Sequence, residues 1–228
     1  MQVSINCRPA YAIANLVFDA SEEAYIERGA MVAMSSAIHL SAGFGGEGLA
    51  KALTRRYLAG ETLLFSKVKA DVSGAWIAVS PAYPGDIEAV ELDPNVPLLA
   101  ESGSLLAYSQ GVRSGVTFSG LRTTVMHEGF TLLHLDGPGT AVLSSYGGIE
   151  PIDIAAGQEV IIDTGHIVAF AESLKFDVGP LQGIASSIAT EEGFVARFSG
   201  PGRILIQTRA ERPFRQWLLP DAPQNTGH

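Results

Sequence analysis

The sequence reads AIANLVFDASEEAYIERGAMVAMS at residues 12–35, DIEAVELDPNVPLLAESGSLLAYS at residues 86–109 and GIEPIDIAAGQEVIIDTGHIVAFA at residues 148–171. These three stretches align without a gap, at offsets of 74 and 62 residues. An internal repeat of this kind makes each copy one structural unit of a larger body, so it decides the fold before any local motif is considered. We therefore predict a fold of three related units.

Every copy contains an acidic residue that is followed two positions later by a glycine. This spacing predicts a short hairpin loop, in which the acid accepts a backbone hydrogen bond and the glycine takes a positive φ. Apolar residues flank each predicted loop on both sides, which is typical of strands that are covered on both faces. The predicted turn positions are Glu27 and Gly29, Glu101 and Gly103, and Asp163 and Gly165.

A second stretch alternates with the first along the chain. It reads EGFTLLHLDGPGTAVLSS at residues 128–145 and EGFVARFSGPGRILIQTR at residues 192–209, and GETLLFSKVKADVSGAWIAVS at residues 60–80 is a more distant first copy. The Gly-Pro-Gly triplet in two of these copies predicts a type II turn, with proline at the first corner and glycine at the second. The triplets are Gly137, Pro138 and Gly139, and Gly200, Pro201 and Gly202.

The composition agrees with one compact all-β body. The 228 residues are 46% hydrophobic and only 17% charged, and 25 of them are glycine, so the chain has enough apolar surface for a core and many tight turns. We predict a single all-β domain at residues 1–212, built of units at about 12–81, 86–145 and 148–209. One short helix is inserted at residues 49–58, and residues 213–228 form a C-terminal tail.

The charge of the chain bears on its partners and its compartment. The low charge content favours a homo-oligomer, because subunit contacts bury apolar patches. A net charge of −9 argues against nucleic-acid binding, which depends on lysine and arginine contacts with phosphate. We expect a cytoplasmic protein, because the sequence shows no secretory signal and no apolar span of about 18 residues. The lone Cys7 fits a reducing compartment.

The stretch GFGGEG at residues 43–48 matches the G-x-G-x-x-G pattern of dinucleotide-binding sites. Such a site needs a parallel crossover between strands, whereas the repeated strands here are predicted to be antiparallel. We therefore interpret this stretch as a connection to the inserted helix. The helix carries Lys51, Arg55 and Arg56, which form either a solvated face or a contact for a protein partner or an anionic membrane surface.

The sequence predicts no catalytic or metal-binding constellation. It has no G-x-S-x-G serine and no phosphate-binding loop, and only Arg8 stands beside Cys7 to favour a reactive thiolate. None of the histidines has the spacing of a metal-binding pair, although some of them could converge in space. The five histidines are His39, His127, His134, His166 and His228.

Several segments together resemble the mitochondrial biogenesis family called altered inheritance of mitochondria. They are the three acid-x-Gly loops, LAGETLLFSKVKA at residues 58–70, PAYPGDIEAVEL at residues 81–92, and EGF, GPG and LIQTR between residues 192 and 209. The resemblance covers residues 2 to about 209 and suggests a bacterial member. It implies an all-β tryptophan RNA-binding attenuator protein-like fold, related to double-stranded β-helices, with pseudo-threefold internal symmetry.

The resemblance implies little about activity. Fungal members of the family are associated with the organisation of the inner mitochondrial membrane, and bacterial members have no assigned activity, so no site residue carries over. RNA binding does not follow from the fold either, because one fold hosts many functions.

These observations predict a non-enzymatic assembly or scaffold protein that needs no cofactor. Two alternatives stay open. One is a small-molecule binding module with an apolar pocket lined by Trp76, Tyr108, Phe130 and Phe170. The other is an enzyme with an unfamiliar site among the histidines.

Overall fold

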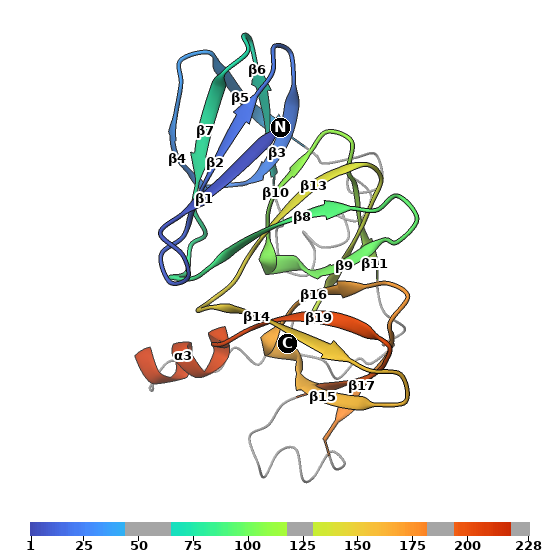
Figure 1. Cartoon of the computed structure of the whole chain (residues 1–228). Coiled ribbons are helices and arrows are strands. Elements are labelled where there is room, and N and C mark those ends of the chain that lie inside the picture. Colours follow the sequence, from blue (N-terminus) through green and yellow to red (C-terminus); the bar gives the residue numbers. More distant parts are fainter. Residues whose placement is uncertain (44–64, 118–129, 182–193, 220–228) are drawn as a thin grey trace.

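The structure is a computed structural model, and it describes residues 1–43, 65–117, 130–181 and 194–219. Within these ranges the chain is all-β, with strands β1 to β19 and the short helix α3. This confirms the prediction of an all-β protein. The strands form four antiparallel sheets, called sheets I to IV here. In Figure 1, strands β1 to β7 lie at the top of the molecule, the green strands that follow them lie in the middle, and β14 to β19 lie at the bottom.

Sheets I and IV are the two small sheets, one at each end of the molecule. Sheet I has the strand order β1-β2-β7-β4, with β1 at Gln2–Asn6, β2 at Ile13–Phe18, β7 at Ala75–Val79 and β4 at Met31–Met34. Sheet IV has the order β15-β18-β17, with β15 at Glu159–Asp163, β18 at Phe194–Ser199 and β17 at Lys175–Pro180.

Sheets II and III are six-stranded and lie between the small sheets. Sheet II has the order β5-β6-β3-β10-β13-β8, with β5 at Ile38–Gly43, β6 at Phe65–Ala70, β3 at Glu23–Glu27, β10 at Leu105–Ser109, β13 at Gly139–Ser144 and β8 at Ile87–Leu92. Sheet III has the order β11-β12-β9-β16-β19-β14, with β11 at Arg113–Thr117, β12 at Leu132–Asp136, β9 at Leu98–Glu101, β16 at Ile167–Ala171, β19 at Gly202–Gln207 and β14 at Ile149–Ile154.

The strand order recurs with a shift of six strands. Adding six to each strand number of sheet II gives the order of sheet III. The same shift converts β4-β7-β2 of sheet I into the β10-β13-β8 half of sheet II, and it converts β11-β12-β9 of sheet III into sheet IV. Sheets I and IV therefore correspond to the two opposite halves of a six-stranded sheet, with β1 added to sheet I.

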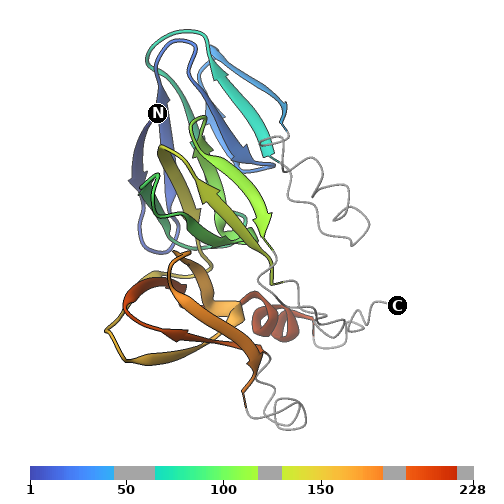
Figure 2. The same ribbon diagram turned by 90° about the vertical axis from the view of Figure 1, so that its right-hand side faces the viewer.

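Three apolar cores fill the spaces between successive sheets. Core 1 joins sheets I and II and contains Leu16 and Leu106. Core 2 joins sheets II and III and contains Tyr108 and Val168. Core 3 joins sheets III and IV and contains Phe198. Figure 2, turned by 90°, shows the N-terminal strands at the top and the C-terminal strands at the bottom. Each inner sheet therefore contributes residues to two cores, one on each face.

The acid-x-glycine turns do not close hairpins. Strands β3 and β4 lie in different sheets, and so do β9 and β10, and β15 and β16. Each turn carries the chain from one sheet into its neighbour, so the hairpin prediction was wrong. The pattern of apolar residues cannot distinguish a turn within a sheet from a turn between two sheets, because both are flanked by covered strands.

The geometry of these turns also differs between the copies. In the second and third turns the acid accepts a hydrogen bond from the glycine N–H, at 2.7 Å for Glu101 and Gly103 and 2.8 Å for Asp163 and Gly165. The chain forms one 3-10 turn at each place, and neither glycine has a positive φ. A positive φ occurs in the first turn alone of the three, where Gly29 has φ 85°.

The Gly-Pro-Gly triplets are not type II turns. Such a turn needs a φ of about +80° at its second corner, but Gly139 has φ 143° and Gly202 has no positive φ. Both glycines begin strands, since Gly139 pairs with Leu92 and Gly202 pairs with Ile154. Both glycines therefore belong to the ladder of a sheet and not to the corner of a turn.

Strands β4, β10 and β16 share a bulge at equivalent positions. The pairing register shifts between Met31 and Ala33 in β4, between Leu105 and Ala107 in β10, and between Ile167 and Ala169 in β16. A bulge leaves one residue of the strand without a direct partner. The bulged residues are Val32, Leu106 and Val168.

Helix α3 at Glu211–Leu218 crosses the boundary at which the C-terminal tail was predicted to begin. The inserted helix predicted at residues 49–58, with Lys51, Arg55 and Arg56, lies outside the described residues, and so does most of the glycine stretch at 43–48.

Candidate functional site: interaction surfaces and a cleft

The structure gives each described histidine its own partner. Two of them bond to a carboxylate and one to a backbone carbonyl, and no two share a partner. Within the described ranges, no group of three or more histidine, cysteine, aspartate and glutamate side chains is placed to hold a metal ion. His127 and His228 lie outside these ranges. The pairs are His39 with Asp71 at 2.7 Å, His134 with Glu172 at 3.3 Å and His166 with the carbonyl oxygen of Gln207 at 2.7 Å.

Cys7 is exposed, and its neighbour Arg8 is engaged elsewhere. The Arg8 guanidinium donates two hydrogen bonds to Asp86, at 2.8 and 2.9 Å, and one to Glu88 at 2.8 Å. The hydrogen bond with Asp86 raises the pKa of Arg8. Because two carboxylates hold this cation, it ties the N-terminal segment to strand β8 and is not directed at the Cys7 sulfur.

The four aromatic residues that were predicted to line one pocket lie in three different places. Tyr108 is buried in core 2, whereas Phe170 is buried in core 3 and Phe130 packs against core 3. Trp76 is exposed on strand β7 of sheet I. The prediction of a shared pocket was therefore wrong. It assumed one closed β body with one interior, but the layers divide the interior into three cores.

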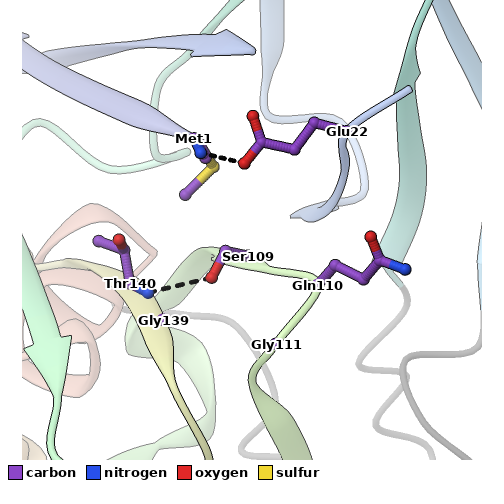
Figure 3. A pocket seen from close by; sticks show the side chains of 7 residues that line it. All are labelled: Met1, Glu22, Ser109, Gln110, Gly111, Gly139 and Thr140. Atoms are coloured by element: carbon purple, nitrogen blue, oxygen red, sulfur yellow. Dashed lines mark hydrogen bonds and ion pairs between the residues drawn. The ribbon is translucent and has the colours of Figure 1, made fainter. Parts of the chain in front are cut away.

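A cleft of about 620 Å³ lies where the N-terminus approaches sheet II. In Figure 3, Met1 and Glu22 face the segment that contains Ser109 and Gln110. Glu22 forms an ion pair with the amino group of Met1, and Ser109 Oγ accepts a hydrogen bond from the backbone N–H of Thr140 at 3.0 Å. The lining of the cleft combines polar and apolar groups, and the hydrogen bond that Ser109 Oγ makes here is with a backbone N–H. The cleft was not predicted, because its lining comes from the N-terminus and from three segments that lie far apart in the sequence.

Helix α3 is attached to the body by a row of aromatic rings. The ring of Tyr146 contacts those of Tyr83 and Phe214, with centroids 5.2 and 5.4 Å apart, and Phe214 stacks on Trp217 at 6.0 Å. Burial, followed by a hydrogen bond with Glu211, raises the pKa of Tyr83 to about 12. Beyond Phe214 the apolar face of the helix is uncovered, since Trp217 is exposed. No helix within the described ranges is long and apolar enough to span a membrane.

The two end sheets leave apolar strands uncovered. All four residues of β4 are exposed, whereas β10 and β16 are each buried at their first four residues. The prediction that these strands are covered on both faces is therefore confirmed for β10 and β16 and wrong for β4. At the other end of the molecule, Ile161 of β15 is exposed.

Comparisons with known proteins agree with the observed fold. An uncharacterized protein of Streptococcus pyogenes serotype M6 is 26% identical over 215 residues, which cover 91% of this chain and 86% of that protein. An X-ray crystal structure of a protein from Streptococcus pyogenes superimposes with a TM-score of 0.79 at 25% identity, covering 95% of this chain and 97% of that one.

The family described as Mitochondrial biogenesis AIM24 matches residues 3–209 of the chain. This span includes all of the described strands except the first residue of β1. The resemblance noted from the acid-x-Gly loops and the EGF, GPG and LIQTR segments is thereby confirmed, and the chain belongs to the mitochondrial biogenesis AIM24 family.

Proposed function

We propose that this protein is a non-enzymatic assembly or scaffold protein of the cytoplasm, that it acts as a homo-oligomer and that it does not bind nucleic acid. One observation carries the proposal, namely the uncovered apolar surface of sheet I. Val32 of β4 is 56% exposed, and Trp76 on the neighbouring strand β7 is also exposed. Large apolar side chains that are exposed together on neighbouring strands mark an interaction site on a protein surface.

The proposal includes a finer description of the fold. We place the chain in the tryptophan RNA-binding attenuator protein-like class, as three equivalent units at about residues 12–81, 86–145 and 148–209 within one domain. The six-strand shift in sheet order supports this description. Equivalent units that contact one another within a chain supply a surface that can also serve between chains.

Native mass spectrometry of the full chain tests self-assembly. We expect a ligand-free oligomer, with a mass that is a multiple of 24.0 kDa. The variant Val32→Lys places a charge on the uncovered strand and should reduce the oligomer at least tenfold, since burying an unpaired charge is costly. Val72→Lys is the matched control, because Val72 is 53% exposed and lies outside β4. A chain that stays monomeric up to high micromolar concentration would contradict the proposal.

A second candidate function is a small-molecule binding module. It is favoured by the cleft beside Met1 and Glu22, whose volume of about 620 Å³ lies within the usual range for ligand sites. Such a ligand would be polar, because serine, threonine and glutamine side chains line the cleft. The same mass spectrum tests this function, since a retained stoichiometric ligand would favour it over assembly alone.

A further inference from the structure

The two inner junctions between units are built in the same way. Strand β3 pairs with β10 inside sheet II, and β9 pairs with β16 inside sheet III, both antiparallel. These two strand pairs lie at the centre of the six-stranded sheets and join one half of each sheet to the other half. The paired residues are Ile26 with Ala107 and Tyr25 with Tyr108 at the first junction, and Ala100 with Ala169 and Leu99 with Phe170 at the second.

The two end sheets each stop at this same junction. Strand β4 corresponds to β10 and β16, and it forms the edge of sheet I at which a β3-like strand would pair. Strand β15 corresponds to β3 and β9, and it forms the edge of sheet IV at which a β10-like strand would pair. Figure 1 shows these edges at opposite ends of the molecule, so one chain cannot join them. An uncovered edge offers backbone donors and acceptors to another strand.

The bulged residue of β4 is exposed, whereas the equivalent residues of β10 and β16 are buried. The bulged residues Leu106 and Val168 are fully buried, whereas Val32 is 56% exposed. Leu106 belongs to core 1 and Val168 to core 2, so each inserts into the core of the preceding unit. Val32 has no preceding unit within its own chain.

Strand β15, the free edge of sheet IV, likewise exposes an apolar residue that is buried at the equivalent position of β9. Leu99 of β9 is 4% exposed, whereas the equivalent Ile161 of β15 is 48% exposed. Met34, which is equivalent to the buried Tyr108 and Phe170, is 39% exposed. Each inner junction therefore brings two large apolar side chains face to face, and each end sheet presents one member of such a pair to solvent.

From these observations we infer that β15 of one copy pairs antiparallel with β4 of a second copy. The register follows from the inner junctions, with Ile161 opposite Met34 and Ile162 opposite Ala33 of the other copy. Val32 then inserts into core 3 of its neighbour. The inference rests on the proposed self-assembly and specifies its interface. Because the two surfaces differ, each added copy leaves one β4 and one β15 free, and the assembly grows head to tail until it closes.

Disulfide cross-linking tests this register. In a Cys7→Ser background, Met34→Cys and Ile161→Cys are prepared as separate proteins and mixed under mild oxidation. Both positions are exposed in the single chain, so neither substitution opens a core. Directly opposed residues of an antiparallel pair have Cβ atoms about 4.5–5.5 Å apart, which is close enough for a disulfide with small backbone adjustment. We expect the mixture to form a cross-link between unlike chains, and each variant alone to form at least tenfold less.

A second mixture controls for the register. It contains Met34→Cys and Glu159→Cys in place of Ile161→Cys, and Glu159 lies on the same strand two residues away from Ile161. Cross-linking of this protein to Met34→Cys should be at least fivefold weaker. An oligomer in native mass spectrometry without the Met34 to Ile161 link would overturn the inferred interface and leave self-assembly standing. Equal homodimer formation by Met34→Cys alone would also overturn it, since that result requires a symmetric contact. A strictly monomeric chain would overturn both proposals.

Discussion

The ring of Tyr108 stacks on the ring of Tyr25, with 4.9 Å between their centroids, across the line at which strands β3 and β10 pair. The Tyr108 side chain is fully buried in core 2, and its hydroxyl accepts a hydrogen bond from Ser114 at 3.2 Å. One side chain thus joins two sheet halves and provides a polar group that is satisfied inside an apolar core.

Replacing this phenol should weaken the fold. The change Tyr108→Phe leaves the buried Ser114 hydroxyl without its partner, which costs about 1 kcal/mol of unfolding free energy. Urea denaturation followed by circular dichroism measures this loss. Tyr11→Phe is the matched control, because Tyr11 is 75% exposed and should be nearly neutral. Equal effects of the two changes would contradict this account of core 2.

The same phenol predicts how stability depends on alkaline pH. Burial raises the pKa of Tyr108 from 10.0 to about 12, so the folded chain holds this proton more tightly than the unfolded chain. The contribution is complete below pH 10 and is lost as the pH rises from about 10 to about 12. Unfolding free energies measured across this interval should decline less steeply in Tyr108→Phe than in the native chain. A decline of the same slope would assign it to other groups, such as Tyr83.

We expect that replacing Glu27 with a neutral residue stabilises the fold. Burial raises the pKa of its carboxyl, and within the described residues this carboxylate has no hydrogen bond of the kind that Glu101 makes with Gly103. A raised carboxyl pKa means that folding disfavours the charged form, so stability declines as the pH rises above the ordinary value of 4.5. Glu27→Gln should therefore raise the unfolding free energy at pH 7 by roughly 0.5 kcal/mol.

Thermal unfolding at pH 3 and pH 7 tests this prediction. The gain from Glu27→Gln should be present at neutral pH and absent at pH 3, at which the native carboxyl is protonated in both states. Glu150→Gln is the control, because Glu150 is exposed on strand β14. A loss of stability at pH 7 would show that the Glu27 charge has a favourable partner.

The equivalent bulged residues should differ strongly when truncated. Leu106→Ala removes a fully buried side chain from core 1 and should cost about 2–5 kcal/mol. Val32→Ala at the equivalent position of β4 should cost less than about 0.5 kcal/mol in dilute solution, at which copies are separated. Chemical denaturation at low and high protein concentration measures both. A large loss for Val32→Ala at every concentration would show that β4 is covered within its own chain.

Much of the architecture could be predicted from the sequence, because it follows from periodic apolar residues. The stretches at 12–35, 86–109 and 148–171 all contain strands with equivalent pairing, and β10 and β16 are covered on both faces as predicted. The passage of the chain from one sheet to the next at the acid-x-glycine turns could not be predicted, because a turn of three residues leads equally well to the same sheet or to the next one. That choice depends on contacts between residues far apart in the chain.

The surfaces that carry the proposals were harder to predict. Val32, Leu106 and Val168 are equivalent apolar residues in the three copies, and nothing in their local sequence shows that the first lies at an end of the molecule. Only the order of the three copies along the chain carries this information. When successive copies share sheets, the first and the last copy each leave half of a sheet without a partner. The cleft beside Glu22 had no comparable signal, because its lining comes from segments that lie far apart in the sequence.

Each six-stranded sheet is built from two successive stretches of chain, which bears on how this fold can evolve. Sheet II takes β3, β5 and β6 from the first stretch of chain and β8, β10 and β13 from the next. A tandem duplication of one coding segment would supply both a missing half for one sheet and a new half for another. The protein could thus gain both halves of a new junction in one genetic event, with the backbone pairing of that junction already present in the copied segment.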